Sequence, residues 1–265
     1  MALTLHYDRH PARGRSELTR PLIILHGLFG FSGNWRSLGR ALSTNSEVIC
    51  VDLRNHGQSP WSDQMSYIDM ADDVAHLIES LDIAPPILLG HSMGGKVAMQ
   101  LVLQGTVDIQ SAIVADIAPI SYQHSHEPLI LAMRSVDFEY VKSRSEVETV
   151  LSRSVQDAGL LGFLMQNVIR SETGYRWRIN LDSIEENMSH LLGFPSIEAT
   201  SAMPTLFIRG ALSDYIQPDH EKMLKEIFTA SRLETIDEAG HWLHAEQPKR
   251  FLEIVRRFID ETSDR

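Results

Sequence analysis

Short apolar runs alternate along this chain with segments of helical periodicity, and this alternation limits the folds open to it. Each run ends at a glycine or near a polar residue, and the runs are 22–25, 48–51, 87–89, 112–115 and 205–208. Near-continuous apolar runs of this length are typical of parallel strands covered on both faces. Amphipathic helices are predicted between or after them, at 69–81, 94–103 and 248–259. The pattern predicts an α/β fold with a mostly parallel, doubly wound sheet.

The alternation stops between residues 119 and 203, which is too long a stretch for a plain connection between strands. We interpret it as a mainly helical cap subdomain, inserted before the penultimate core strand. Residues 1–118 and 204–265 would then form the core. An apolar stretch around Phe163 is expected to face either the substrate pocket or the interior of the cap.

The composition argues against several classes of partner. The net charge of −11 disfavours nucleic acid and anionic membrane surfaces, since both attract clustered Lys and Arg. No stretch approaches the ~18 apolar residues of a membrane-spanning helix, so stable membrane association is not expected. The single cysteine, Cys50, lies in an apolar run, which indicates a buried thiol and no intrachain disulfide. With no signal-peptide-like apolar region at the N-terminus, a reducing, cytoplasmic location is expected.

Residues 90–95, Gly-His-Ser-Met-Gly-Gly, contain a G-x-S-x-G arrangement between a predicted strand and a predicted helix. A serine in this context sits on a sharp strand-to-helix turn, and the flanking glycines let the turn close. Serine is a poor nucleophile unless a base lies beside it and a substrate can reach it. The context therefore predicts that Ser92 is a catalytic nucleophile.

An oxyanion hole and a general base are the next requirements of such a site. Met93, at the start of the helix, offers one main-chain N–H, and Leu28, in the glycine-rich turn after an early strand, offers a second. The base comes last in chain order in this fold. His241 follows a predicted strand at about 233–236 and precedes the final helix, so it is the predicted base.

Two aspartates could orient the base. Asp116 ends the strand after the nucleophile's helix, and Asp214 follows the penultimate strand, so the residues alone leave both open. The histidines show no metal-ligand spacing such as H-E-x-x-H, and we expect neither a metal nor a cofactor. Phe29, Phe163 and Trp242 are candidates for the substrate pocket.

Almost the whole chain resembles the α/β-hydrolase fold superfamily, and more narrowly the YbfF-type esterases and the related abhydrolase domain-containing protein 11 group. The resemblance is carried by five segments, namely His-Gly-Leu-Phe-Gly at 26–30, Asp-Leu-Arg-Asn-His-Gly-Gln-Ser-Pro at 52–60, Gly-His-Ser-Met-Gly-Gly-Lys at 90–96, Asp-Ile-Ala-Pro at 116–119 and Gly-His-Trp at 240–242. Most superfamily members carry the acid at the position held here by Ser213. The YbfF-type resemblance implies that Asp116 supplies the acid instead, with Ser213 supporting the site.

These features predict a serine hydrolase of the carboxylesterase or thioesterase class (EC 3.1), acting on a small acyl ester or thioester through an acyl-enzyme. Two alternatives stay open at this point. One is carbon–carbon cleavage or lyase chemistry on the same triad. The other is a hydrolase-like ligand sensor that signals through its cap.

Overall fold

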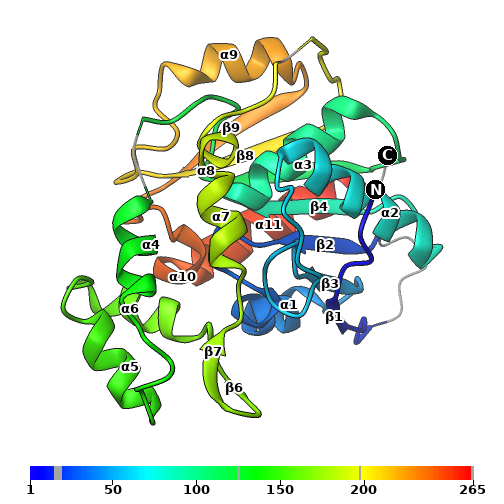
Figure 1. The fold of residues 1–265 in the computed structure, drawn as a ribbon. Coiled ribbons are helices and arrows are strands. Elements are labelled where there is room, and N and C mark those ends of the chain that lie inside the picture. The colour runs from blue at the N-terminus through cyan, green and yellow to red at the C-terminus, as the bar shows by residue number, and fades with distance from the viewer. Residues whose placement is uncertain (15–19, 124–125, 197, 264–265) are drawn as a thin grey trace.

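A seven-stranded sheet runs through the centre of the molecule in the order β1-β3-β2-β4-β5-β8-β9 (Figure 1). The computed structural model describes residues 1–14, 20–123, 126–196 and 198–263. In chain order the strands are β1 (Tyr7–His10), β2 (Leu22–Leu25), β3 (Val48–Val51), β4 (Ile87–His91), β5 (Ser111–Ala115), β8 (Thr205–Gly210) and β9 (Ser231–Ile236). Strand β1 pairs antiparallel with β3, and all other neighbours in this sheet are parallel. The predicted fold class is confirmed.

Helices cover both faces of the sheet, as buried parallel strands require. On one face α2 (Tyr67–Leu81) and α3 (Met93–Gln104) pack on Ile23 and Leu25 of β2. On the other face α1 (Arg36–Leu42) and α11 (Pro248–Ser263) pack on Leu22 and Ile24 of the same strand. Successive side chains of β2 therefore enter different cores, which explains why its apolar run has no polar interruption.

The predicted strands and helices correspond to observed elements, with small differences at their ends. Strand β4 continues to His91, and α2 begins at Tyr67, where Ser66 caps it and accepts a hydrogen bond from the Asp69 N–H. Strand β1 and the helices α1 and α9 (His220–Ile227) were not predicted from the sequence. Strand β1 has no buried residue, so it carries no apolar run that a sequence pattern could reveal.

A long segment separates β5 from β8, and we call residues 119–203 the insert. Its elements are α4 (Glu127–Arg134), α5 (Arg144–Leu151), α6 (Ala158–Met165), the hairpin of β6 (Val168–Ser171) and β7 (Gly174–Trp177), α7 (Leu181–Glu186) and α8 (Met188–Leu192). In Figure 1 the helices α4 to α6 and this hairpin gather to one side of the central sheet. The buried side chains of Leu151, Leu164 and Ile184 pack within the same apolar cluster as α2 and α3.

Lys96 connects the start of the insert and the end of α8 to α3. Its side chain is buried, and Nζ donates to the carbonyl oxygens of Ile120 at 2.9 Å and Leu192 at 3.1 Å, and to that of Gly193. The last two carbonyls lie at the C-terminal end of α8, where a helix presents unpaired carbonyls and negative partial charge. The insert is thus anchored to the helix that follows Ser92.

In the part of the chain that the structure describes, no helix combines the length and the apolar character needed to cross a membrane.

Candidate active site

Ser92 occupies a sharp turn between β4 and α3, with φ of 51° and ψ of −119°. The turn is so tight that a Cβ added to Gly90 would lie 2.1 Å from the Gly94 carbonyl oxygen. One added to Gly94 would lie 2.3 Å from the carbonyl oxygen of Leu25. Both contacts are shorter than any real Cβ tolerates, so glycine is required on each side of the serine. This is the physical basis of the G-x-S-x-G pattern.

The structure brings Ser92, His241 and Asp116 together from three separate loops. Ser92 Oγ lies 3.0 Å from His241 Nε2, and His241 Nδ1 lies 2.8 Å from Asp116 Oδ2. These residues follow β4, β9 and β5, whose carboxyl ends lie at one edge of the sheet. The carboxyl edge of a parallel sheet is where open α/β folds bind ligands.

Asp116 is fully buried and its carboxylate accepts hydrogen bonds from two further groups. The Gly210 N–H donates to Oδ1 at 3.1 Å, and the Ser213 hydroxyl donates to Oδ2. Asp214 is exposed, and its Oδ1 accepts from the Gln217 side chain at 3.2 Å. Of the two aspartates left open by the sequence, Asp116 is the one that contacts His241.

Two aromatic residues hold His241 in addition to Asp116. Tyr215 stacks on the imidazole with ring centroids 3.8 Å apart and an angle of 15° between the planes. His91 Nε2 donates to the main-chain oxygen of His241 at 2.8 Å, so His91 supports the loop and its ring is not placed as a base for Ser92. Sequence reasoning missed Tyr215, because nothing in the sequence indicates that this loop lays an aromatic ring against the histidine.

The glycine-rich turn at residues 26–30 passes directly against the serine. A Cβ added to Gly27 would lie 3.3 Å from Ser92 Cβ. Leu28 and Met93 both line a small cavity of about 30 Å³ together with Ser92. Met93 is the first residue of α3, and an N–H at that position lacks an intrahelical acceptor. The two predicted oxyanion residues therefore flank the serine on the same cavity.

Two buried histidines stabilise this turn as neutral rings. His26 Nε2 accepts from the Leu53 N–H at 3.0 Å, and His56 Nε2 accepts from the Phe29 N–H at 3.1 Å. Their Nδ1 atoms donate to the main-chain oxygens of Gly27 and Arg54. Burial lowers the pKa of both rings, that of His56 to about 3, where the nearby His26 adds to the effect. A neutral ring is needed, because a protonated Nε2 could not accept these N–H groups.

A larger cavity of about 260 Å³ opens beside Ser92 and His241. Phe29, Phe163 and Trp242, the three candidates for the substrate pocket, all line it, and so does Leu160 of α6. Its wall includes His244, which stacks on Trp35 at 4.4 Å and whose pKa burial lowers to about 3. The lining is largely apolar, as in most sites for small organic ligands.

Strained backbone concentrates around these groups. Phe29, Ser92 and Asp116 adopt φ values of 62°, 51° and 53°, in the left-handed region that residues with a Cβ rarely enter. Such residues persist only where the surroundings fix them, and they cluster at functional sites. Among the described residues no group of three or more His, Cys, Asp or Glu side chains is arranged to hold a metal ion.

Comparison with known proteins agrees with this architecture. The sequence model of the alpha/beta hydrolase fold family matches residues 20–248. The sn-1-specific diacylglycerol lipase ABHD11 of Mus musculus is 36% identical over 252 residues, which cover 92% of this chain and 82% of that protein. Esterase YbfF of Escherichia coli (strain K12) is 32% identical over 242 residues, 91% of this chain and 93% of that one. A solved marine microorganism esterase superposes with a TM-score of 0.91 at 42% identity, covering 97% of this chain and all of the other.

The chain belongs to the α/β-hydrolase fold family, within the YbfF and ABHD11 type that its sequence resembles. It is a carboxylesterase-type hydrolase, the enzyme class predicted from its motifs.

Proposed function

We propose that this protein hydrolyses carboxylic acyl esters through an acyl-enzyme on Ser92. The observation that carries the proposal is the pair of contacts made by His241, one to Ser92 Oγ at 3.0 Å and one to Asp116 Oδ2 at 2.8 Å. A nucleophile, a base within hydrogen-bonding reach and a third group that orients the base are the signature of an activated serine.

The chemistry follows from these positions. His241 removes the proton of Ser92 as Oγ attacks the ester carbonyl, and Asp116 stabilises the imidazolium that forms. The N–H groups of Leu28 and Met93 bind the oxyanion of the tetrahedral intermediate. His241 then gives its proton to the leaving alcohol. Water activated by the same histidine attacks the acyl-enzyme, releases the acid and restores Ser92.

Ser213 supports the acid in this proposal. Its hydroxyl donates to Asp116 Oδ2, the oxygen that also faces His241. A hydroxyl cannot replace a carboxylate charge, but it can hold the carboxylate in place by donating a hydrogen bond to it.

The substrate proposal is an uncharged ester with an apolar acyl chain. The cavity beside Ser92 is largely apolar, and Leu160 and Phe163 of the insert form part of its wall. We therefore propose that the insert acts as a cap that completes the pocket, with residues 1–118 and 204–265 as the core. Names such as diacylglycerol lipase and esterase among the relatives favour acylglycerols and simple esters. A thioester would form the same acyl-enzyme.

We further propose that the protein acts in a reducing compartment such as the cytoplasm. Its only cysteine, Cys50, is buried and forms no disulfide.

The test is a substrate screen with purified protein. It compares p-nitrophenyl esters of increasing chain length, mono- and diacylglycerols and acyl-CoA thioesters, with Ser92→Ala as the control for each. We expect repeated turnover and a fluorophosphonate adduct on Ser92, both absent from the variant. Activity retained by Ser92→Ala would contradict the nucleophile. A single covalent event without turnover would favour the ligand sensor.

A further inference from the structure

We propose that Asn167 of the insert and His56 of the core are positioning residues that together fix the oxyanion turn through residue Phe29. The inference rests on the proposed function, because it concerns the donor that Leu28 would supply. Phe29 adopts a φ of 62°, a strained conformation for an aromatic residue. A residue keeps such a conformation only where its surroundings leave it no alternative.

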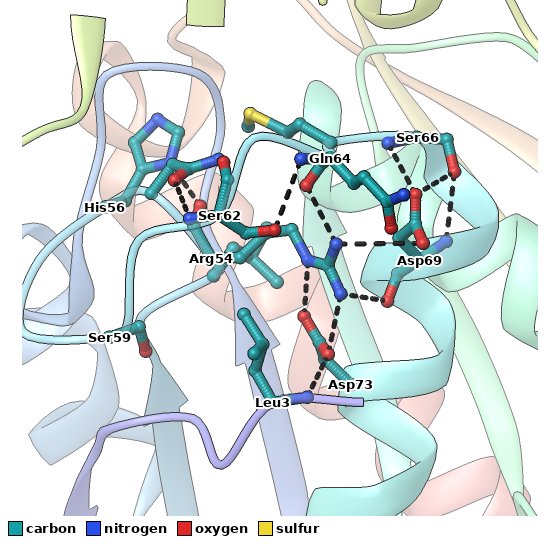
Figure 2. A network of polar contacts seen from close by, with 12 residues as sticks. Leu3, Arg54, His56, Ser59, Ser62, Gln64, Ser66, Asp69 and Asp73 are labelled. Atoms are coloured by element: carbon teal, nitrogen blue, oxygen red, sulfur yellow. Dashed lines mark hydrogen bonds and ion pairs between the residues drawn. The ribbon is translucent and has the colours of Figure 1, made fainter. Parts of the chain in front are cut away.

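The core side of this arrangement is His56. Its Nε2 accepts from the Phe29 N–H at 3.1 Å, and its Nδ1 donates to the Arg54 carbonyl oxygen at 3.0 Å. Arg54 is itself immobilised, because its guanidinium makes two hydrogen bonds with the Asp73 carboxylate, at 2.7 and 2.8 Å. Figure 2 shows His56 on the loop beside Arg54, whose guanidinium points to Asp73 and Asp69 of α2. The acceptor of the Phe29 N–H is therefore fixed to the core.

The insert side is Asn167, between α6 and β6. Its Nδ2 donates to the Phe29 carbonyl oxygen at 2.8 Å, and the residue is fully buried. Both main-chain polar groups of Asn167 are hydrogen-bonded. Its N–H donates to the Leu164 carbonyl oxygen, and its own carbonyl oxygen accepts from the Arg178 N–H at 2.7 Å. The Arg178 guanidinium in turn lies 4.1 Å from the ring centre of Phe31, two residues beyond Phe29.

Phe29 is thus held at both its main-chain N–H and its carbonyl oxygen by buried side chains from two parts of the chain. The N–H of its neighbour Leu28 belongs to the same peptide group as the Gly27 carbonyl oxygen. That oxygen accepts hydrogen bonds from the Gly30 N–H at 2.9 Å and from His26 Nδ1 at 2.8 Å. Because the peptide is planar and trans, the Leu28 N–H points in the direction opposite to this carbonyl, and fixing the carbonyl therefore fixes the N–H. Phe29 is the third residue of the turn that the Gly27–Gly30 bond closes, and this is the position at which a type II turn needs a positive φ.

The consequence is that the placement of the insert determines the geometry of an oxyanion donor. Donors aimed at the oxyanion stabilise charge that develops only in the transition state, so their misplacement lowers kcat more than it raises KM. If Asn167 had a purely structural role, its replacement would lower the stability of the fold without lowering kcat more than it raises KM.

Asn167→Ala tests the insert side, with Asn187→Ala as its matched control. Asn187 is also a buried asparagine of the insert, and its Nδ2 donates to a core carbonyl, that of Asp63, at 2.8 Å, away from residues 26–30. We expect Asn167→Ala to lower kcat for p-nitrophenyl butyrate about 10- to 100-fold, less than the full loss of an oxyanion donor, with KM within about twofold. The affinity for an alkyl boronic acid, which mimics the tetrahedral intermediate, should fall in parallel. Asn187→Ala should lower the melting temperature and leave kcat within about twofold.

His56→Leu and His56→Gln test the core side. Leucine removes the acceptor, whereas the Oε1 of glutamine can take the place of Nε2 and accept from the Phe29 N–H. We expect a similar fall of kcat in His56→Leu and its partial recovery in His56→Gln. Equal kcat losses in Asn167→Ala and Asn187→Ala, or a normal kcat in Asn167→Ala, would overturn the inference. A different result would contradict the proposed function itself, namely turnover that is retained in Ser92→Ala.

Discussion

The hydroxyl of Ser213 donates to Asp116 Oδ2, the same carboxylate oxygen that lies 2.8 Å from His241 Nδ1. Ser213 follows β8, and Asp116 follows β5, which is its parallel neighbour in the sheet. The two loops therefore reach the histidine from adjacent strands. A carboxylate at position 116 or at position 213 would lie near the same imidazole, and in this chain Asp116, on the loop after β5, supplies it.

We predict that Asp116→Asn lowers kcat by about 10⁴-fold, as the equivalent change does in a serine protease, because an amide can hold the imidazole in the wrong tautomer. Asp214→Asn should change kcat less than about threefold, since Asp214 is exposed and contacts Gln217 instead. Steady-state kinetics on one p-nitrophenyl ester measures both. A large loss in Asp214→Asn alone would refute the assignment of the acid.

The acid should also be transferable between the two loops. We predict that adding Ser213→Asp to Asp116→Asn raises kcat at least about tenfold above that of Asp116→Asn alone, since the Ser213 side chain contacts the carboxylate oxygen that faces His241. Ser213→Asp alone should lose activity, because two buried carboxylates in contact cannot both be ionised at low cost. The measurement is kcat for the double variant against each single variant. A double variant no better than Asp116→Asn would show that the β8 loop cannot present an acid to His241.

Local patterns predicted the parts of this molecule that depend on short stretches of chain. The strands β2 to β5 could be predicted because every one of their residues is buried and the sequence is apolar there. Ser92 could be predicted because its turn requires glycine at positions 90 and 94. The choice of Asp116 over Asp214 depends on how two loops fold, and the residues alone left it open. Only the resemblance to a family favoured Asp116.

Other features depend on contacts between distant segments and left no pattern to read. Asn167 contacts Phe29 across 138 positions of sequence, and a single asparagine between a helix and a strand belongs to no motif. The tautomer of His56 follows from partners that only the folded chain supplies. Tyr215 stacks on His241 because of the path of one loop.

Acid should destabilise the fold through its buried histidines. Burial, together with the neighbouring His241, lowers the pKa of His244 from its usual 6.5 to about 3. Below pH 6.5 the His244 ring therefore binds a proton in the unfolded chain but not in the folded one. The unfolding free energy decreases as the pH is lowered, until the folded ring also protonates near pH 3.

We predict that His244→Gln flattens the dependence of the unfolding free energy on pH by up to ~1.4 kcal/mol per pH unit between pH 6 and 4, the effect of one proton. Urea denaturation at a series of pH values measures this slope. The control is His76→Gln, which removes a histidine from the exposed side of α2 and leaves the buried ring of His244 in place. An equal slope in the parent and His244→Gln would contradict the prediction.

Cys50 should be inert to thiol reagents in the native protein. The side chain is fully buried on β3, and burial raises the pKa of its thiol to about 12, so the reactive thiolate is scarce at neutral pH. We predict no loss of esterase activity and no mass increase after treatment with iodoacetamide at pH 7.5, and full labelling once urea unfolds the chain. Rapid labelling of active, folded protein would contradict the burial of this thiol.

The buried ion pair of Arg54 and Asp73 should contribute far more to stability than the exposed pair of Arg134 and Asp182. Arg54 and Asp73 have 3% and 0% of their side chains exposed, against 40% and 79% in the second pair, although both pairs contain a contact of 2.7 Å. Removing one partner of a buried pair leaves an uncompensated charge and costs about 3–5 kcal/mol, whereas an exposed pair contributes less than about 1 kcal/mol. Asp73→Asn should therefore lower the unfolding free energy several times more than Asp182→Asn in urea denaturation. Similar losses in the two variants would mean that water reaches Arg54 in the native protein.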